Sequence, residues 1–385
     1  MAVVKLTADQ VLAWRTGRHL LHRPAGMTSV DVVGRLVAVQ AQVASAAEQA
    51  VAARQADPRP GALAAALADR RLVKTWAMRG TLHLLRVEDA PACLALLAAG
   101  RFWEKGSWQR AFVTVARMSA IAEAAAAALN GRMLTREQLS AEIVDRTGDR
   151  DLADHLASGW GAVLKPLAWQ GLLVHGPNEG NRVTFTRPDT LLPDWPGLPD
   201  PDEAAARVVP AWLGAYGPAS AETFDQWLSR GGSKRAALRG WFTRLVEAGE
   251  LAPVTVDDRP AYARAADLDG LAEARPDDVV RLLPAFDQWV LGPGTKDTTI
   301  IPTARRAAVS RAAGWISPVV VHRGRVVGTW EARDGEPVVD LWPESGPVPA
   351  EPLDAERARL RAYLSGGADS LPAGGGTLPA GGDDA

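Results

Sequence analysis

The stretch that decides the fold of this chain is Gly171-Leu172-Leu173-Val174-His175-Gly176-Pro177-Asn178-Glu179-Gly180-Asn181-Arg182-Val183-Thr184-Phe185. Two runs of alternating apolar residues flank a turn rich in Gly, Pro and Asn, which predicts a β-hairpin. Two helices are predicted before it. A capping signal at residues 135–138 starts the first. An apolar stripe that includes Trp160 predicts the second over residues 156–170. Nearer the N-terminus, a capping box at residues 7–10 and a helix start near Thr28 predict two further helices.

The same outline repeats farther along the chain. In chain order, the repeat is predicted as a helix over 204–216, a helix opened by Ser220, a helix over 234–248 and a hairpin over 251–262 with its turn at Asp257-Asp258. Gly171 and Gly249 hold the same place, at a helix end where glycine tolerates the left-handed conformation. Helices that lead into a hairpin outline a winged helix, so the sequence predicts an α+β protein with tandem winged-helix units.

The C-terminal third is richer in strand signals. Strands are predicted over 279–283, on both sides of a tight turn at residues 323–325, and over 338–342, before a last helix over 354–363. The predicted parts are a first winged-helix unit over 1–130, a second over 131–200, a third over 201–265, a β-rich region over 266–365 and a low-complexity tail, predicted to be disordered, over 366–385.

Composition limits the function classes. The chain is 47% apolar and 23% charged, which is ordinary for a globular protein, and its net charge of −2 gives no global sign of a polyanionic partner. One cysteine, Cys93, allows no intramolecular disulfide and fits a reducing cytoplasm. The six histidines have no spacing expected of a metal site, and neither a signal peptide nor a membrane-length apolar run is evident. We therefore expect a cytoplasmic monomer without metal, cofactor or membrane contact.

The first candidate site is Gln40-Ala41-Gln42, two amides at the end of an apolar run that predicts a helix from about residue 28 to Gln40. On an ideal helix these side chains would point roughly 200° apart. If both line one pocket, the helix must therefore end, kink or loosen there. The alternative is that Gln40 bonds within the fold while Gln42 is solvated.

The second candidate site is Trp76-Ala77-Met78-Arg79-Gly80-Thr81-Leu82-His83, within a segment over 72–85 that is predicted to be extended. Arg79, Thr81 and His83 alternate, as side chains on one face of a strand do. An unpaired buried amide, imidazole or guanidinium is costly, so these groups are either satisfied structurally or wait for a ligand. His83 could be a structural histidine, and Arg79 could belong to a buried ion pair.

Basic residues cluster where a DNA-binding surface of winged helices would need them. Lys234, Arg235, Arg239 and Arg244 lie along the predicted recognition helix of the third unit, and His322, Arg323 and Arg325 lie at a hairpin tip that could enter a groove. The alternative is that the winged-helix units are scaffold and that these side chains are simply solvated.

Taken in order, these motifs resemble the AlkZ-like DNA glycosylases, a family of tandem winged-helix proteins. Gln40-Ala41-Gln42 is similar to the family's Gln-x-Gln motif, and residues 76–83 match its Trp-x-x-Arg-Gly-Thr-x-His stretch. Residues 282–287 and 328–330 resemble its C-terminal landmarks, so that the resemblance runs from about residue 5 to 365. A related YcaQ-like branch has aspartate at the second position of the motif, whereas this chain has Gln42.

The resemblance implies a C-shaped monofunctional glycosylase that wraps double-stranded DNA and removes alkylated purines. In some members these are bulky N7 adducts or interstrand crosslinks, in repair or in self-resistance to genotoxins. It implies that Gln40 and Gln42 contact the catalytic water, and it leaves Arg79, Thr81 and His83 to shape the site or hold phosphate. No lysine adjoins the motif in the sequence, so a Schiff-base mechanism is not expected.

The chemistry of such a reaction explains why neutral amides suffice at the site. An N7-alkylated guanine is cationic and leaves as a neutral base, so that the enzyme needs mainly a positioned water and relief for an oxocarbenium-like sugar. A carboxylate would add general-base power that poorer leaving groups require. We therefore expect cationic lesions to be preferred. The alternative function is a non-catalytic winged-helix DNA-binding protein, such as a regulator or an adduct shield.

Overall fold

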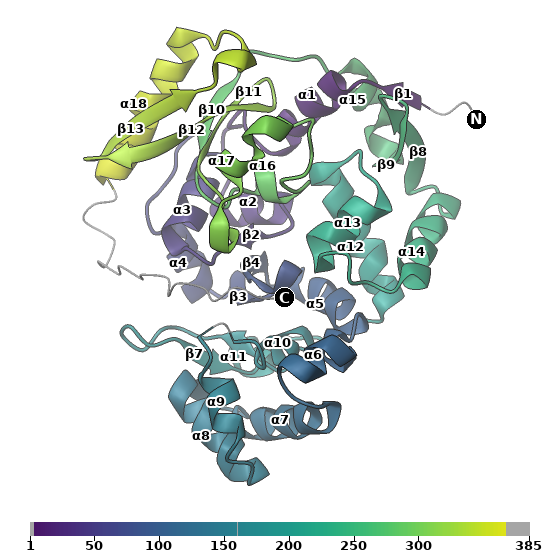
Figure 1. The fold of residues 1–385 in the computed structure, drawn as a ribbon, viewed down its shortest axis with the longest axis vertical. Helices are drawn as coiled ribbons and strands as arrows, with labels where there is room; N and C mark the ends of the chain where they lie inside the picture. Colours follow the sequence, from purple (N-terminus) through teal and green to yellow (C-terminus); the bar gives the residue numbers. More distant parts are fainter. Residues whose placement is uncertain (1–3, 160, 367–385) are drawn as a thin grey trace.

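The computed structural model describes residues 4–159 and 161–366 and shows a mixed α/β protein with three sheets. Figure 1 shows elements from both ends of the chain in the upper part, helices α12 to α14 beside them, and α7 to α9 below. The main hydrophobic core runs through the lower and middle parts, and smaller clusters lie under the N-terminal helices and the C-terminal sheet.

The N-terminal helices begin at the predicted caps. Capping boxes at Thr7 and Thr28 start α1 (Ala8–Arg18) and α2 (Ser29–Arg35). The predicted continuation of the second helix to Gln40 is wrong. The helix ends at Arg35, Val37 adopts a left-handed φ of 64°, and the chain then forms β2 (Val39–Gln40). A β-branched residue at positive φ is sterically costly, so the neighbouring packing must hold this break in place.

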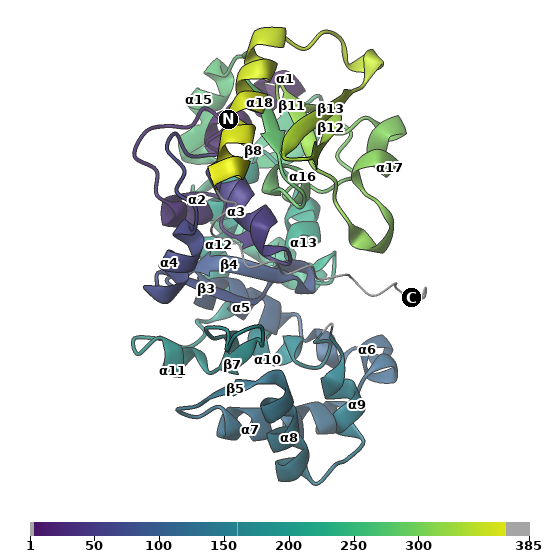
Figure 2. The same ribbon diagram turned by 90° about the vertical axis from the view of Figure 1, so that its left-hand side faces the viewer.

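A six-stranded sheet crosses the middle of the molecule in the order β2-β4-β3-β6-β7-β5. Its strands include β3 (Leu72–Trp76), β4 (Leu82–Arg86), β5 (Met133–Thr135), β6 (Val174–His175) and β7 (Thr184–Thr186). Figure 2 shows β3 and β4 above β5 and β7, with helices on both sides. The sheet therefore spans the predicted boundary at residue 130, because the hairpin predicted at 171–185 pairs with β3.

The segment over 72–85 is a hairpin and not the single extended strand that was predicted. A 3₁₀ turn, η1 (Met78–Gly80), separates β3 from β4, with Arg79 at φ 58° and Gly80 at φ 71°. Arg79 thus lies in the turn and does not share a strand face with Thr81 and His83. The alternation of polar residues suggested a strand, but Gly80 permits the tight reversal.

The lower part contains α7 (Val115–Ala128) and α8 (Arg136–Thr147), which starts at the predicted capping box of Thr135. The single helix predicted over 156–170 is wrong. Two short helices, α9 (Leu152–Ala157) and α10 (Lys165–Trp169), replace it. Gly161, at φ 62°, reverses the chain against the Trp76 ring, where a Cβ atom would come within 2.6 Å of Trp76 Cζ2. Trp160 lies outside the described residues.

The third group of elements follows the sequence pattern closely. It comprises α12 (Pro201–Tyr216), α13 (Ala221–Ser229), α14 (Arg235–Glu247), β8 (Leu251–Val256) and β9 (Arg259–Arg264). Asp257 and Asp258 form the hairpin turn, both at positive φ, as predicted. Strand β1 (Val4–Leu6) adds to this hairpin in parallel with β8, which ties the N-terminus to it.

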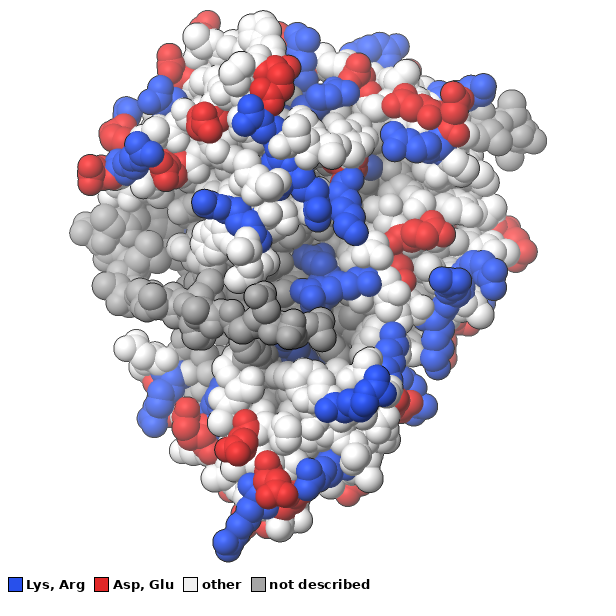
Figure 3. Space-filling model, in the orientation of Figure 1, with Lys and Arg blue, Asp and Glu red and all other residues white. Residues whose placement is uncertain are grey.

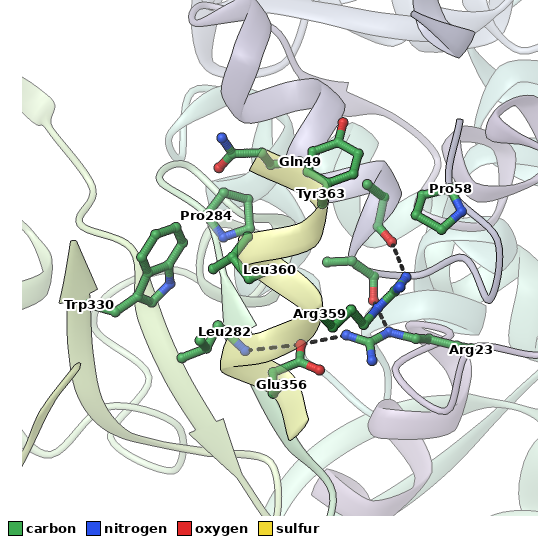
Figure 4. A pocket seen from close by; sticks show the side chains of 12 residues that line it. Arg23, Gln49, Pro58, Leu282, Pro284, Trp330, Glu356, Arg359, Leu360 and Tyr363 are labelled. Carbon is green, nitrogen blue, oxygen red and sulfur yellow. Dashed lines mark hydrogen bonds and ion pairs between the residues drawn. The ribbon is translucent and has the colours of Figure 1, made fainter. Parts of the chain in front are cut away.

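The C-terminal region contains the strands that its sequence predicts. Four antiparallel strands, β10 (Val280–Leu283), β11 (Val319–His322), β12 (Arg325–Arg333) and β13 (Glu336–Leu341), form one sheet. Helix α18 (Ala350–Gly366) packs against β10. In the close-up of Figure 4, Glu356 of α18 reaches Arg23 and the backbone N–H of Leu282. Arg359 of the same helix donates to the carbonyls of Ala52 and Gln55.

The other helices of four or more residues fill the spaces between these units. They are α3 (Ala44–Ala52), α4 (Ala62–Ala68), α5 (Ala90–Ala99), α6 (Gly106–Ala111), α11 (Pro188–Leu191), α15 (Leu268–Glu273), α16 (Gln288–Leu291) and α17 (Arg306–Val309). In residues 4–159 and 161–366, no helix is long and apolar enough to cross a membrane. The predicted tail lies outside the described residues except for Gly366, which ends α18.

Candidate functional site

Gln40 and Gln42 lie together against the β3–β4 hairpin. Strand β2 pairs with β4 at Gln40 and His83, and the Ala41 N–H donates to the Leu82 carbonyl at 2.8 Å. Because strand side chains alternate, the i and i+2 amides reach the same side. Gln42 Oε1 accepts from the Leu82 N–H at 3.4 Å, and Gln40 Oε1 accepts from the Thr81 hydroxyl at 3.4 Å. The two amides therefore meet at one end of the hairpin.

Arg79 anchors Gln40 from the η1 turn. Its Nη2 donates to Gln40 Oε1 at 3.2 Å, and its Nη1 donates to the Trp227 carbonyl of α13 at 3.1 Å. Burial lowers the pKa of Arg79 to about 10, and the nearby positive charge of Arg230 contributes to this lowering. The guanidinium remains charged at neutral pH, and it fixes the amide by linking the hairpin to α13.

Thr81 and His83 support this arrangement from within the hairpin. The Thr81 hydroxyl lies 3.2 Å from the Met78 carbonyl as well as near Gln40, and one hydroxyl proton can serve only one acceptor at a time. His83 is completely buried, and its Nδ1 donates to the Thr81 carbonyl at 3.0 Å. Burial, with the charge of Arg79, lowers the pKa of His83 to about 3. His83 is therefore neutral and holds the turn.

The hydrogen bonds leave the two amides with complementary capacity. Gln40 is only 6% exposed; its Oε1 accepts from Arg79 and lies within reach of the Thr81 hydroxyl, while its NH₂ group has no acceptor among the described residues. Gln42 is exposed, and its Oε1 accepts one donor and can take another. Among the described residues, no carboxylate hydrogen-bonds to either glutamine or to Arg79. This site can therefore hold and orient a water without a strong general base.

A pocket of about 210 Å³ adjoins the hairpin on the Arg79 side. It is lined by Arg79, Gly80, Leu97, Phe102, Trp108, Phe112, Ala162, Lys165, Trp169, Leu228 and Ser229. Lys165 and Trp169 of α10 lie directly over Gly80, each 3.6 Å from where its Cβ would be. Lys165 thus lies beside the second motif, although it is distant from it in the sequence. No local pattern signals Lys165, because it lies more than eighty residues from the motif.

Three of the four basic residues predicted to contact DNA from α14 have no ion-pair partner among the described residues. Lys234, Arg235 and Arg239 are exposed, and in the part of the chain that the structure describes none of them forms an ion pair. Arg244, on the same helix, is instead paired with Asp202 at 2.5 Å. Figure 3 shows lysine and arginine side chains gathered around a hollow in the middle of one face, with acidic side chains mainly toward the rim.

The tip of the β11–β12 hairpin does not project, contrary to the expectation. Arg323 pairs with Asp278 at 2.7 Å, Arg325 pairs with Asp9 at 2.7 Å, and the buried His322 lies 3.4 Å from Asp278. Gly324 lies against α1, where a Cβ would be 2.7 Å from the side chain of Leu12. The tip is therefore docked on the N-terminal helix, and a DNA contact by these three residues remains a prediction.

Comparisons with known proteins agree with this geometry. The family model described as "DNA glycosylase AlkZ-like" matches residues 33–365. The chain is 47% identical over 359 residues to an interstrand DNA cross-link repair glycosylase from Streptomyces sahachiroi, covering 93% of this chain and 96% of that protein. The solved structure of Streptomyces sahachiroi DNA glycosylase AlkZ matches with a TM-score of 0.89 at 46% identity, covering 94% of this chain and 98% of that one.

The residues that the family model matches contain the paired amides, the hairpin beside them and the C-terminal sheet. Identity near one half over this length establishes more than a shared fold. The chain belongs to the AlkZ-like DNA glycosylases, a family of DNA repair enzymes that hydrolyse N-glycosidic bonds.

Proposed function

We propose that this protein hydrolyses the N-glycosidic bond of cationic, N7-alkylated purines in double-stranded DNA, with Gln40 and Gln42 holding the attacking water. The observation that supports the proposal is the pair of amides fixed at one end of the β3–β4 hairpin, with no carboxylate of the described residues hydrogen-bonded to either. A site without a strong general base suits a substrate whose base is already a good leaving group.

The two amides make different hydrogen bonds to the water. The NH₂ group of Gln40 donates a hydrogen bond to one lone pair of the water, and Gln42 Oε1 accepts a hydrogen bond from one of its O–H groups; the proton passes to solvent as the bond to the sugar forms. The second lone pair then points at C1′ of the damaged nucleotide. Two fixed contacts hold the nucleophile in a near-attack position, and such positioning lowers the barrier without a strong base.

Charge explains the expected preference for cationic bases. As the glycosidic bond breaks, the positive charge of an N7-alkylated guanine moves to the sugar and the base leaves neutral. An uncharged base such as uracil or hypoxanthine must instead leave as an anion or be protonated. Among the described contacts of the two glutamines, no acidic side chain is placed to supply that proton.

The proposal extends to bulky adducts and interstrand crosslinks. A relative that is 47% identical is named an interstrand DNA cross-link repair glycosylase, which supports this range. We further propose that the helix-and-hairpin units form tandem winged helices in a C-shaped monomer around duplex DNA. The unpaired cations of α14 in the described chain support this arrangement.

The test is base release under single-turnover conditions from duplex DNA that contains one N7-methylguanine. Gln40→Ala and Gln42→Ala should each slow release by about a hundredfold while DNA binding persists, since each removes one of two positioning contacts. Gln49→Ala is the matched control, because Gln49 lies on α3 and faces α18. Duplexes with uracil or hypoxanthine should be processed much more slowly.

Two outcomes would contradict the proposal. If neither glutamine variant alters base release while binding persists, the amides do not hold the water. If uncharged bases are removed as fast as N7-methylguanine, the charge argument fails. DNA binding without any base release would instead favour a non-catalytic DNA-binding protein.

A further inference from the structure

We propose that the pocket beside the hairpin binds a flat aromatic ring system of the substrate. This is either the damaged base itself or a planar group attached to it. The pocket lies on the Arg79 side of the amide pair and is lined mainly by aromatic and aliphatic side chains. The inference deepens the proposed function and rests on it, since it places part of the same substrate.

The pocket walls offer aromatic surface that the fold does not cover completely. Phe102, Trp108 and Phe112 come from the segment around α6, and all three are half-buried. Trp108 and Phe112 have ring centroids 5.1 Å apart, and Phe102 meets the buried Trp169 edge to face at 5.7 Å. Aromatic faces with open area beside them favour stacking with a planar ligand.

One end of the pocket is positively charged. Arg79 and Lys165 both line it, and in the described chain neither forms an ion pair with a carboxylate. Burial lowers the pKa of Lys165, and the nearby positive charge of Arg230 contributes to this lowering. An aromatic pocket with a cationic end matches a nucleotide, whose base is planar and whose phosphate is anionic.

The pocket and the amide pair share one residue, Arg79. Arg79 forms part of its wall and also donates to Gln40 Oε1 at 3.2 Å. A group bonded to the sugar carbon that the water attacks would therefore be within reach of the pocket. Its volume of about 210 Å³ equals roughly seven water molecules, enough for a fused two-ring system and below the usual size of drug-binding pockets.

Trp108→Ala and Phe112→Leu test the inference, with Trp14→Ala as the control. Trp14 is also half-buried, but it packs against Gly270, far from the pocket in the sequence and outside its lining. Single-turnover base release is measured on two duplexes. One carries N7-methylguanine, and the other carries an N7-guanine adduct with a fused aromatic ring system. Removal of one stacking face should slow release about tenfold.

The two substrates distinguish the possible occupants. If both duplexes are processed more slowly, the pocket takes the nucleobase. If only the bulky adduct is processed more slowly, the pocket takes the planar group of the adduct. Trp108→Phe should recover most of the rate in either case, because it restores an aromatic face. A merely structural role would lower the unfolding temperature and the rate on both duplexes without this recovery.

The inference is overturned if both pocket variants release both bases at the wild-type rate, or if the control is as slow as they are. Either result leaves the proposed function intact as long as the Gln40 and Gln42 variants release the base about a hundredfold more slowly than the wild-type protein. Should the wild-type protein release neither base, the proposed function itself fails. Phe112→Leu keeps an apolar side chain and gives the decisive comparison if Trp108→Ala fails to fold.

Discussion

At the scale of single residues, the candidate site depends on how Gln40 is held. The Arg79 guanidinium has its donors in a planar fork, and two of them reach acceptors on different elements, Gln40 on β2 and the Trp227 carbonyl on α13. A point charge on a flexible stem cannot reproduce both contacts. Arg79 is therefore a positioning residue, although its position in the motif alone suggested a possible phosphate contact.

Arg79→Lys should slow base release by roughly ten- to a hundredfold, because a small displacement of Gln40 displaces the water it holds. DNA affinity should change less than the rate. Arg86→Lys is the matched control, since Arg86 lies at the far end of β4 and pairs with Asp89. Equal rates for Arg79→Lys and the wild-type protein would show that the link to α13 does not position the amide.

Two buried histidines make stability depend on pH. Burial lowers the pKa values of His83 and His175 to about 3, from an ordinary value near 6.5. Below pH 6.5 the unfolded chain binds protons that the folded chain does not, so the free energy of unfolding falls as the pH falls toward 3. Each histidine contributes a slope of up to about 1.4 kcal/mol per pH unit.

His175→Phe should flatten this slope. His175 packs between Trp76 and Phe185, which a phenyl ring in its place can also contact. The measurement is urea unfolding at several values between pH 5 and 8. The variant and the wild-type protein should differ in slope below pH 6.5 and run parallel above it. Parallel curves over the whole range would mean that His175 does not resist protonation in the folded state.

At the scale of elements, α14 and the β11–β12 hairpin differ in whether their basic side chains have carboxylate partners, which a count of charges in the sequence does not show. The helix with its N-cap carries four basic residues in the sequence, and the hairpin tip carries three. Lys234, Arg235 and Arg239 are exposed and unpaired in the described chain, whereas Arg323 and Arg325 have carboxylate partners. Surface ion pairs are worth little, but they lower the net charge that a phosphate would meet. Helix α14 is thus the better candidate for a phosphate contact.

Salt dependence of duplex binding tests this element. Alanine at Lys234, Arg235 or Arg239 should reduce the slope of log K against log salt concentration by about one for each phosphate that the variant no longer neutralises. Arg244→Ala, on the same helix, is the matched control, because Arg244 is already paired with Asp202. If the control changes the slope as much as the other three, α14 does not face the DNA in the proposed way.

At the scale of the whole molecule, a buried ion pair joins the N-terminal and C-terminal parts of the chain. Arg54 follows α3, and its Nη1 and Nη2 donate to the carboxylate of Asp287 at 2.8 and 2.7 Å, with both side chains completely buried. Asp287 also caps α16 through the Trp289 N–H. The C-terminal landmark over 282–287 thus braces the helix that follows Gln42.

Asp287→Ala should lower the free energy of unfolding by about 3–5 kcal/mol, because it leaves a buried guanidinium without its partner. Glu344→Ala, which breaks the exposed pair with Arg305, should change the free energy of unfolding far less, because solvent screens this pair. Urea unfolding measures both. A small cost at Asp287 would mean that water or another group readily replaces the carboxylate, and that the brace contributes little.

The sequence by itself determined the hairpins at 171–185 and 251–262 and the capped starts of α1, α2 and α8. These depend on local turn and cap chemistry, which a few neighbouring residues settle. It also predicted the strands of the C-terminal sheet and the motif residues. It was wrong where long-range packing opposed the local pattern, in the helix predicted to reach Gln40 and in the one predicted over 156–170.

Where the motif residues lie relative to one another depends on long-range contacts in the tertiary structure. Whether Gln40 and Gln42 share a side depends on β2 pairing with β4, a contact between segments some forty residues apart. The pocket draws Lys165 and Trp169 to Gly80 across more than eighty residues, and the brace joins Arg54 to Asp287 across more than two hundred. Packing of this kind arises from the whole chain at once, so that residue types and spacing identify the participants but cannot place them.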